Sequence, residues 1–300
     1  MGHDDMEAVI ESLRALGARP VRKRNLALLT QPPLFDIEVA AACNIVCAFC
    51  PRDEMVRASK LMDESTFAAV LAFLPSKAVV MISGLGDATV HPRLPDMVGR
   101  LVAKGVSTCM ITNGVRLTDG RQIALIEAGI SEIQVSVHGW SDEAVRRVVP
   151  VGSAPGTVRA NVERLAARAG PRVRVNFVET DDNGHEREAV RAWAESLGVR
   201  FFHRRQHTRG GTIGHDRGEG CSGCGIFGSV TFISVDGDVL PCVNDVRGDG
   251  RFGNVRQVDW ESVLAWKRGV IDEQRWFGAC RSCDDDYRWV LLANGGLDGA

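Results

Sequence analysis

The sequence predicts an α/β fold in which six strand–helix units form an incomplete barrel and a smaller cysteine-rich region follows. Three observations predict it. Apolar runs typical of strands alternate with helical segments between residues 34 and 203, which favours a parallel sheet with right-handed crossovers. A loop with three cysteines follows the first strand, where barrels of this kind carry their sites. After residue 203 the alternation stops and five more cysteines appear.

The barrel elements follow from hydrophobic periodicity and from residues that start or stop helices. Strands are expected at 35–39, 78–82, 106–111, 132–137, 172–178 and 199–203. Helices are expected at 64–74, 94–104, 119–128, 156–168 and 186–197, and an amphipathic helix at 3–17 precedes them. Asp63 is placed to cap the first barrel helix, and Gly198 to end the last. Six units are fewer than the eight of a closed barrel, so the barrel should be partial.

The C-terminal region is predicted to be a hairpin and a helix that need a metal. Asp236-Gly237 separates two apolar runs between residues 229 and 240, which is a strong hairpin signal. A helix is expected at about 258–270, followed by a cysteine pair. Because this region has few core residues, bound metal would stabilise it. We therefore expect a lead-in at 1–33, a barrel at 34–210 and a metal-binding domain at 211–300.

Composition excludes several classes of protein. The chain has 300 residues, 45% of them hydrophobic, and a net charge of -2, so neither nucleic acid nor a membrane surface is an expected partner. The N-terminus is acidic and lacks the apolar core of a signal peptide, and no apolar stretch of about 18 residues is present. We expect a cytoplasmic protein whose nine cysteines are reduced. Cys109, inside an apolar run, should be a core residue.

The first cysteine group is Cys43, Cys47 and Cys50. Three thiolates can hold three corners of a four-iron cluster, and the fourth iron is then open to a small molecule. The same thiols could also hold zinc or a simple electron-transfer centre. The run at 43–50, placed after the first of six strand–helix units, resembles the signature of the radical S-adenosylmethionine (radical SAM) enzymes. The resemblance implies a TIM-like (β/α)6 barrel, a [4Fe-4S] cluster and S-adenosylmethionine.

The resemblance also implies a chemistry and a set of cofactor-binding residues. In this family a 5'-deoxyadenosyl radical abstracts hydrogen from the substrate, after reduction by a flavodoxin-type or ferredoxin-type donor. The turn at 84–87 is similar to the family's Gly-Gly-Glu-like turn, which meets the cofactor's amino group. The Arg146-Arg147 pair either meets the methionyl carboxylate or forms a solvated helix face. The implied cofactor-binding residues, most of them at strand ends, are Phe49, Gly84, Gly86, Asp87, Asn113, Ser136, His138 and Asn176.

The second cysteine group resembles the SPASM/Twitch extension of some radical SAM enzymes. The resemblance lies in the spacing from Cys224 to Gly237 and Cys242, and in the later pair Cys280 and Cys283. No further cysteine follows that pair, so the shorter Twitch form fits better. The four cysteines would saturate a second [4Fe-4S] cluster that relays electrons. A structural zinc site with the same four thiolates is the alternative.

Within the family, the chain most resembles Twitch-type dehydrogenases that act on an aminocyclitol in aminoglycoside antibiotic biosynthesis. The likeness rests on the cysteine run with its following proline, on Arg209–Gly211 and on Leu240–Cys242. It implies oxidation of an alcohol to a ketone in a small polar, sugar-like or aminocyclitol-like molecule, with the auxiliary cluster as electron acceptor. Peptide-modifying relatives usually carry an extra peptide-binding domain, for which we expect no room in 300 residues, so a small polar metabolite is the expected substrate.

The catalytic residues remain open at this point. A dehydrogenase needs a base, and the candidates after the sixth strand are His203, Arg204, Arg205 and His207, of which a histidine is chemically easier. Cys221 is surplus: it could replace Cys224 as a ligand, be inert, or donate a hydrogen atom. Hydrogen-atom donation by Cys221 would suit a sugar epimerase, which is the second functional hypothesis after the dehydrogenase. A zinc-bound scaffold without catalysis is the third.

Overall fold

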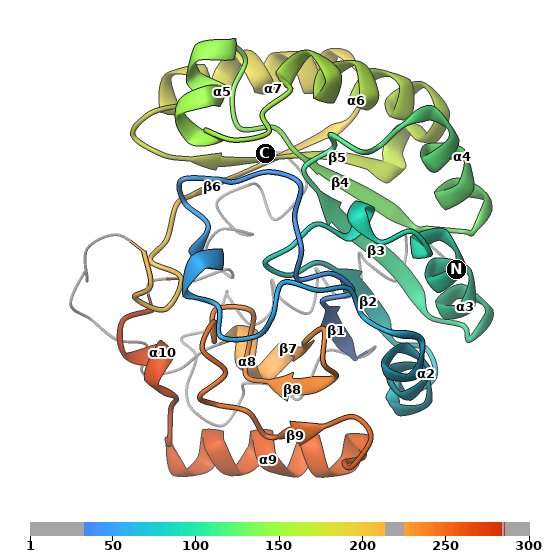
Figure 1. The fold of residues 1–300 in the computed structure, drawn as a ribbon, viewed down its shortest axis with the longest axis vertical. Helices are drawn as coiled ribbons and strands as arrows, with labels where there is room; N and C mark the ends of the chain where they lie inside the picture. Colours follow the sequence, from blue (N-terminus) through green and yellow to red (C-terminus); the bar gives the residue numbers. More distant parts are fainter. Residues whose placement is uncertain (1–32, 214–224, 284, 286–300) are drawn as a thin grey trace.

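A computed structural model describes residues 33–213, 225–283 and 285, and its parallel sheet confirms the predicted fold class. The six barrel strands are neighbours in the order β6-β5-β4-β3-β2-β1, and every adjacent pair is parallel (Figure 1). They are β1 (Leu34–Ile37), β2 (Val79–Ile82), β3 (Ser107–Thr112), β4 (Glu132–Ser136), β5 (Val173–Glu179) and β6 (Arg200–Arg205).

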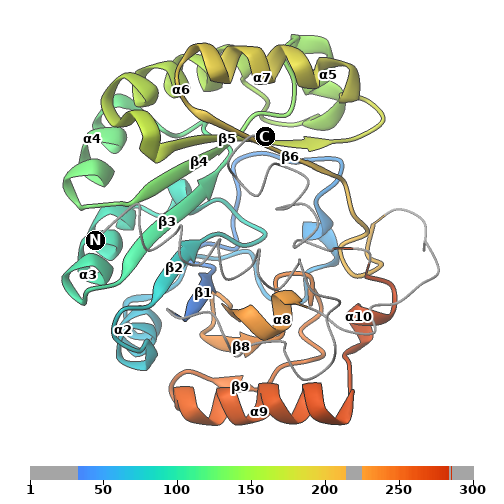
Figure 2. The same ribbon diagram turned by 180° about the vertical axis from the view of Figure 1, so that it is seen from behind.

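Helices cover the outside of this curved sheet, as both ribbon views show (Figures 1 and 2). The predicted barrel helices are present as α2 (Glu64–Phe73), α3 (Leu94–Ala103), α4 (Asp119–Glu127), α6 (Pro155–Ala169) and α7 (Arg187–Ser196). The Asp63 carboxylate caps α2 by accepting from the backbone N–H of Thr66. Not predicted were α5 (Asp142–Val148) and the short 3-10 turns η1 (Pro51–Glu54), η2 (Ala88–Val90), η3 (Gly170–Arg172) and η4 (Gly184–Glu186).

The C-terminal region continues the barrel sheet. β7 (Val230–Ile233) pairs in parallel with β1, and β8 (Asp238–Leu240) and β9 (Gly253–Asn254) follow in antiparallel order. The predicted hairpin is confirmed, and its Gly237 has a φ of 82°, which favours glycine. The helices here are α8 (Gly225–Ser229), α9 (Trp260–Glu273) and α10 (Gly278–Arg281). The pairing of β7 with β1 was not predicted. The boundary between two domains at residue 210 stays a prediction.

The two faces of β1 show how the core and the site are separated. Phe35 and Ile37 are completely buried in the hydrophobic core. Asp36 and Glu38 alternate with them and therefore face the barrel interior. Cys109 on β3 is also completely buried, as predicted. The helix expected at 3–17 lies outside the described residues.

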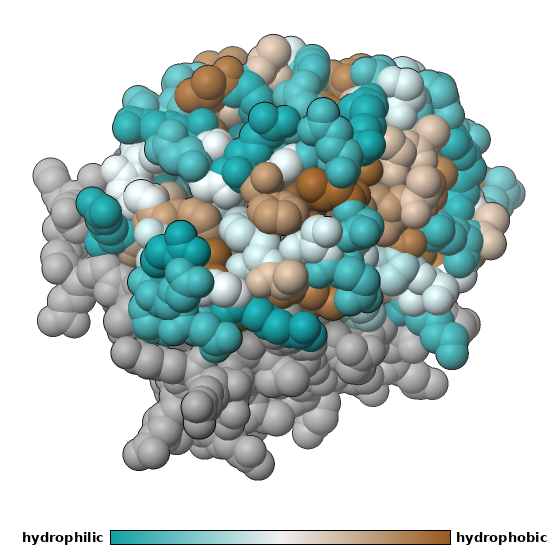
Figure 3. Space-filling view, turned by 90° about the horizontal axis from the view of Figure 1, so that it is seen from below, coloured by the Kyte–Doolittle hydropathy of each residue, from teal (hydrophilic) through white to brown (hydrophobic). Residues whose placement is uncertain are grey.

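On the face seen from below, the described residues are mainly hydrophilic with smaller hydrophobic areas between them (Figure 3). Among the described residues, no helix combines the length and the apolar character that crossing a bilayer requires. The exposed large hydrophobic side chains include Val56 and Val151, at 74% and 57% exposure.

Candidate active site

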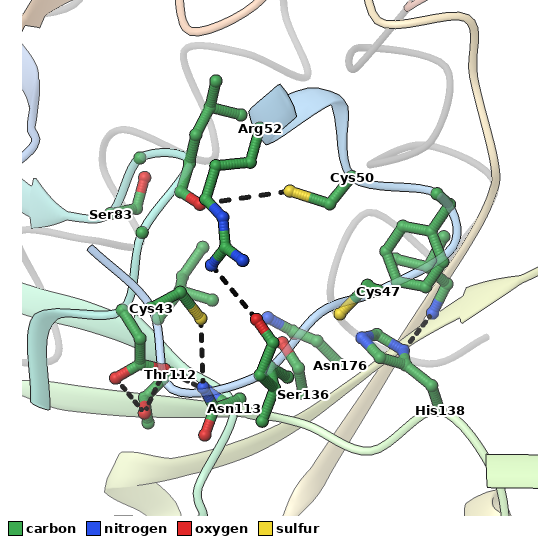
Figure 4. Close-up of a pocket in the computed structure, with 18 of the residues that line it drawn as sticks. Cys43, Cys47, Cys50, Arg52, Ser83, Thr112, Asn113, Ser136, His138 and Asn176 are labelled. Carbon is green, nitrogen blue, oxygen red and sulfur yellow. Dashed lines mark hydrogen bonds between the residues drawn. The ribbon is translucent and has the colours of Figure 1, made fainter. Parts of the chain in front are cut away.

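A cavity of about 220 Å³ opens at the carboxyl ends of the barrel strands (Figure 4). Cys43, Cys47 and Cys50 line one side of it, and residues that end or follow β2 to β6 line the other. The three sulfur atoms surround one space, beside which the guanidinium of Arg52 lies. Arg52 is held there by a 3.1 Å hydrogen bond to the carbonyl oxygen of Ile45. The predicted cysteine loop therefore lies where parallel α/β barrels place their chemistry.

The electrostatics of these thiols fit an iron cluster. Burial raises the pKa of Cys43, and burial together with the neighbouring thiols raises the pKa of Cys47 to about 12. A lone thiolate is therefore disfavoured, and bound iron would supply the compensating positive charge. Among the described residues, no three His, Cys, Asp or Glu side chains lie close enough to share one metal ion. A cluster is larger than one ion and is held by thiolates spaced further apart.

A buried carboxylate that was not predicted joins the segments before and after the cysteine loop. Glu38 is completely buried and forms two hydrogen bonds with Arg57, of 2.6 and 2.9 Å. The same carboxylate accepts from the backbone N–H groups of Leu85, at 2.9 Å, and Val235, at 3.4 Å. It therefore links β1, the turn after β2 and the C-terminal hairpin. An acidic residue alternating with apolar ones in strand 35–39 was the available signal.

The glycines of the turn at 84–87 are required by close packing. A Cβ on Gly86 would lie 2.2 Å from the carbonyl oxygen of Ala40 and 2.5 Å from that of Ala42. Gly84 has a φ of 137°, and a Cβ there would lie 2.6 Å from the Glu38 side chain. Both glycines line the cavity, where the resemblance places the cofactor's amino group. The close approach to residues 40–42 is a second reason for glycine that the sequence did not show.

Asp87 organises the turn after β3. Its Oδ2 accepts from the Thr112 hydroxyl at 2.9 Å and from the Asn113 backbone N–H at 2.6 Å. The Asn113 side-chain amide in turn donates to Asn44 at 3.0 Å and lies 3.6 Å from the sulfur of Cys43. Asp87 and Asn113 both line the cavity, so the structure brings these predicted residues together beside the first cysteine.

Phe49 and His138, both predicted to bind the cofactor, form one aromatic pair. Phe49 packs edge-on against His138, with ring centroids 5.0 Å apart. Burial lowers the pKa of His138 to about 4, so the ring is neutral at pH 7. Its Nδ1 accepts from the backbone N–H of Val178 at 3.2 Å, which leaves the ring proton on Nε2. Both residues line the cavity and give one wall an aromatic, uncharged surface.

Ser136 and Asn176 also line the cavity, as predicted. The Asn176 amide donates to the side-chain oxygen of Gln134 at 2.9 Å. Its own Oδ1 is buried and has no hydrogen-bond partner among the described residues. A buried acceptor without a partner is costly, so a donor from a bound ligand fits here. Ribose or substrate hydroxyls have the required chemistry.

The base candidates are separated by strand alternation. Arg204 lines the cavity and forms an ion pair with Asp285 at 2.8 Å. His203, the preceding residue, is not among the lining residues and pairs with Glu179 at 2.6 Å. The Arg205 side chain is 82% exposed. His207 is buried 3.6 Å from Asp285, and burial lowers its pKa to about 2.

The Arg146-Arg147 pair does not face the cavity. Both side chains are exposed on α5, where they pair with Asp142 and Glu143 one turn earlier. Such i,i+4 pairs stabilise a short helix modestly. Of the two interpretations of this pair, the structure supports the solvated helix face.

Two further groups near the cavity were not predicted. Arg209 lines it, has a φ of 52°, and donates to Asn244 at 3.4 Å. Ser83 lines it at the end of β2, and its hydroxyl donates to Asp36 at 2.5 Å. Burial raises the pKa of Asp36 to about 7, despite the opposing hydrogen bond from Ser83. A carboxyl with this pKa exchanges protons near neutral pH.

Three of the four proposed auxiliary ligands are described. Cys242, Cys280 and Cys283 are partly buried, and burial raises the pKa of Cys242. The charges of Cys280 and Cys283 raise the pKa of Cys242 further. Cys224 and Cys221 lie outside the described residues, so the structure leaves their roles as predictions.

Comparison with known proteins identifies the family. The model of the radical SAM superfamily matches residues 37–194, more than half of the chain. The SPASM model, an iron-sulfur cluster-binding domain, matches residues 221–284. Both matches contain the predicted cysteine groups. They support iron–sulfur clusters over the zinc alternatives at both groups.

Curated relatives match at low identity. A tungsten-containing aldehyde ferredoxin oxidoreductase cofactor-modifying protein of Pyrococcus furiosus is 25% identical over 54% of this chain and 48% of its own length. A PqqA peptide cyclase of Rhizobium meliloti is 27% identical over 51% of this chain and 40% of its own length. The chain thus spans about half or less of these relatives. The mycofactocin maturase MftC of Mycobacterium tuberculosis is 24% identical over 85% of this chain and 76% of its own.

Solved structures share the fold. BtrN, in complex with AdoMet and 2-DOIA, has a TM-score of 0.60 and 19% identity, covering 84% of this chain and 93% of its own. Streptococcus suis SuiB, bound to the precursor peptide SuiA, has a TM-score of 0.65 and 14% identity, covering 84% and 69%. The cavity fits the cofactors that the family models imply, because it combines three thiols with an unpartnered buried acceptor. The chain therefore belongs to the radical SAM superfamily, with S-adenosylmethionine and [4Fe-4S] clusters, one of them auxiliary, as its cofactors.

Proposed function

We propose that this enzyme oxidises an alcohol carbon of a small polar molecule, sugar-like or aminocyclitol-like, to a ketone. The observation that carries the proposal is the small cavity walled by hydrogen-bonding side chains. Its polar lining includes Ser83, Gln134, Ser136, Asn176 and Arg204. Such a wall suits a ligand with several hydroxyl or amino groups. The fold of BtrN, which was crystallised with AdoMet and 2-DOIA, adds support.

The reaction divides between the cofactors and the chain. When bound, the cofactors supply a 5'-deoxyadenosyl radical that takes one hydrogen atom, and an auxiliary cluster that takes the remaining electron. The ketone forms only if the hydroxyl proton also leaves, so the chain must provide an acceptor for it. We propose a flavodoxin-type or ferredoxin-type protein as the external electron donor.

We assign the proton acceptor to Asp36, reached through Ser83. Ser83 lines the cavity and its hydroxyl donates to Asp36, so this hydroxyl could take the substrate's proton while passing its own to the carboxylate. The pKa of Asp36, about 7, suits proton transfer near neutral pH. His203 and His207, the easier bases on chemical grounds, are not among the residues that line the cavity.

Replacing Asp36 with asparagine should reduce product formation by about 100-fold or more, because an amide cannot accept the proton. Wild-type activity should rise with pH through about 7 and then level off, since the carboxylate must be ionised. The variant should lose this dependence and keep both clusters. Rates between pH 5.5 and 8.5 and iron counts check this.

The matched control for Asp36→Asn is Asp181→Asn, because Asp181 is an exposed carboxylate in the loop after β5. The control should keep the wild-type rate and pH profile, whereas Ser83→Ala should share the defect of Asp36→Asn. An Asp36→Asn enzyme with normal rates at pH 8 would rule out the assignment.

The alternative is an epimerase, motivated by Cys221 in the sequence. Anaerobic turnover in heavy water with candidate sugars and aminocyclitols separates the two reactions. A dehydrogenase should give a product lacking two hydrogens, whereas an epimerase should give a product carrying one solvent deuterium. Cys221→Ala should abolish an epimerase and leave a dehydrogenase nearly unchanged. A deuterated product of substrate composition would refute the proposed oxidation.

A peptide substrate is a further candidate, favoured by two of the comparisons. SuiB was solved with a precursor peptide, and relatives include PqqA peptide cyclases. The same mass measurement with candidate peptides tests it. Turnover of a peptide, with none of any sugar or aminocyclitol, would favour this candidate over our proposal.

A further inference from the structure

One buried carboxylate joins the auxiliary-cluster segments to the cavity wall. Asp285, two residues after Cys283, has a side chain only 5% exposed. Its Oδ1 accepts from the guanidinium of Arg204 at 2.8 Å. Its Oδ2 accepts from the side-chain amide of Asn244 at 2.9 Å, and Asn244 lies two residues after Cys242. Both cysteine-bearing segments therefore meet at one side chain.

The segment that follows β6 packs tightly against the same place. The Thr208 hydroxyl donates to the carbonyl oxygen of Ser282 at 2.7 Å. Gly211 has a φ of 81°, and a Cβ there would lie 2.6 Å from the Cβ of Ser282. Gly210 has a φ of 67°, and its Cβ would lie 3.0 Å from the carbonyl oxygen of Asn244. Residues 204–211 are thus fitted to both cysteine-bearing segments.

Arg204 connects Asp285 with the cavity. Its side chain is 15% exposed and lines the cavity at the end of β6. A long guanidinium side chain has several rotamers, and a buried, charge-assisted pair selects one of them. Removing the carboxylate would take away a buried counter-charge of the guanidinium and weaken its hold on this position.

We propose that Asp285 is a positioning residue, which holds Arg204 in the cavity wall and so connects the auxiliary-cluster segment with the substrate site. The inference rests on the assignment of Cys242, Cys280 and Cys283 to the auxiliary cluster. It does not depend on alcohol oxidation. If the enzyme proves to act on another substrate, the positioning role still stands.

The test measures the midpoint potential of the auxiliary cluster by EPR-monitored titration with dithionite and ferricyanide. Removing a negative charge near a cluster stabilises its reduced form, so Asp285→Asn should raise the potential. Arg204→Gln removes a positive charge and should lower it. Opposite shifts separate these charge effects from a general loss of structure, which would not depend on the sign of the removed charge.

The double variant tests positioning itself. If Asp285 holds Arg204, Arg204→Gln should shift the potential by less than half as much in the Asp285→Asn background as in the wild type. Asp285→Glu keeps the charge and should restore most of that shift. Equal shifts in the wild-type and Asp285→Asn backgrounds would overturn the proposal.

The control is Glu273→Gln, which breaks an exposed ion pair with Arg275 at the end of α9. It should leave the potential unchanged. All variants should retain about eight irons, the content of two four-iron clusters. If Asp285→Asn and Asp285→Glu both lose about four irons, the carboxylate serves the cluster itself and the proposal fails.

Discussion

Replacing Cys50 with alanine is expected to abolish the reductive release of 5'-deoxyadenosine from S-adenosylmethionine. Cys50 is one of three thiols around a single space, and its sulfur lies 3.9 Å from the carbonyl oxygen of Leu85. Without it, two thiolates remain for a cluster that needs three protein ligands here. Loss of an outer partner of a metal ligand typically costs about 10- to 100-fold, so loss of a ligand should exceed about 100-fold.

The measurement pairs product analysis with iron content. Anaerobically reconstituted wild type should contain about eight irons and the Cys50→Ala variant about four. With dithionite and S-adenosylmethionine, the variant should release 5'-deoxyadenosine only at background level. Retention of eight irons together with normal release would remove Cys50 from the cluster and contradict the site as built.

Cys109→Ala is the matched control, because this cysteine is completely buried in β3 and is not among the residues that line the cavity. Removing its sulfur leaves a small void that costs about 1 kcal/mol of unfolding free energy. The control should keep its iron and its rate of cofactor cleavage. If both variants lost iron equally, instability rather than ligation would explain the result.

The barrel could be predicted because its signals are local. The expected strand 78–82 is observed as Val79–Ile82, and the expected helix 64–74 as Glu64–Phe73. Each arises from periodic apolar residues and short capping signals within one segment. The seven-residue α5 was missed because it is too short to show a clear period. The pairing of β7 with β1 was missed because it joins segments almost 200 residues apart.

Site residues could be predicted where they belong to a short sequence motif. They could not be predicted where their position depends on which face of a strand points into the barrel. The cysteine loop and the turns after β2 and β3 meet as the spacing implied. By contrast, Arg204 and His203 are adjacent, and only the strand phase places one at the cavity and the other beside Glu179. Asp36 was not predicted as a site residue for a related reason. The proton-accepting role that we propose for Asp36 depends on Ser83, which is 47 residues away in the sequence.

The residues that support the cluster loop were the hardest to anticipate. Glu38 forms hydrogen bonds with three segments that are far apart in the sequence. The residues around Glu38 do not predict which segments these are. A buried glutamate at this position is expected only if an ion-pair partner is known, and here the partner is Arg57. The same applies to Asp285, whose partners come from β6 and from the segment after Cys242.

Replacing Gly86 with alanine should destabilise the protein by about 3 kcal/mol and displace the cysteine loop. The added Cβ would lie 2.2 Å from the Ala40 oxygen, 2.5 Å from the Ala42 oxygen and 2.7 Å from the Ala41 carbonyl carbon. These are backbone atoms directly before Cys43, so no side-chain rotation relieves the overlap. An apparent Tm lower by about 5–10 °C and a loss of about four irons are expected.

Gly269→Ala separates this effect from the mere addition of a methyl group. Gly269 lies within α9, and a Cβ there would meet no heavy atom within 4 Å. Because alanine favours a helix over glycine, this control should be neutral or more stable by up to about 1 kcal/mol. A Gly86→Ala protein with wild-type Tm and full iron content would mean that residues 40–42 can move without disturbing the cluster. The close approach would then not be what requires glycine at this position.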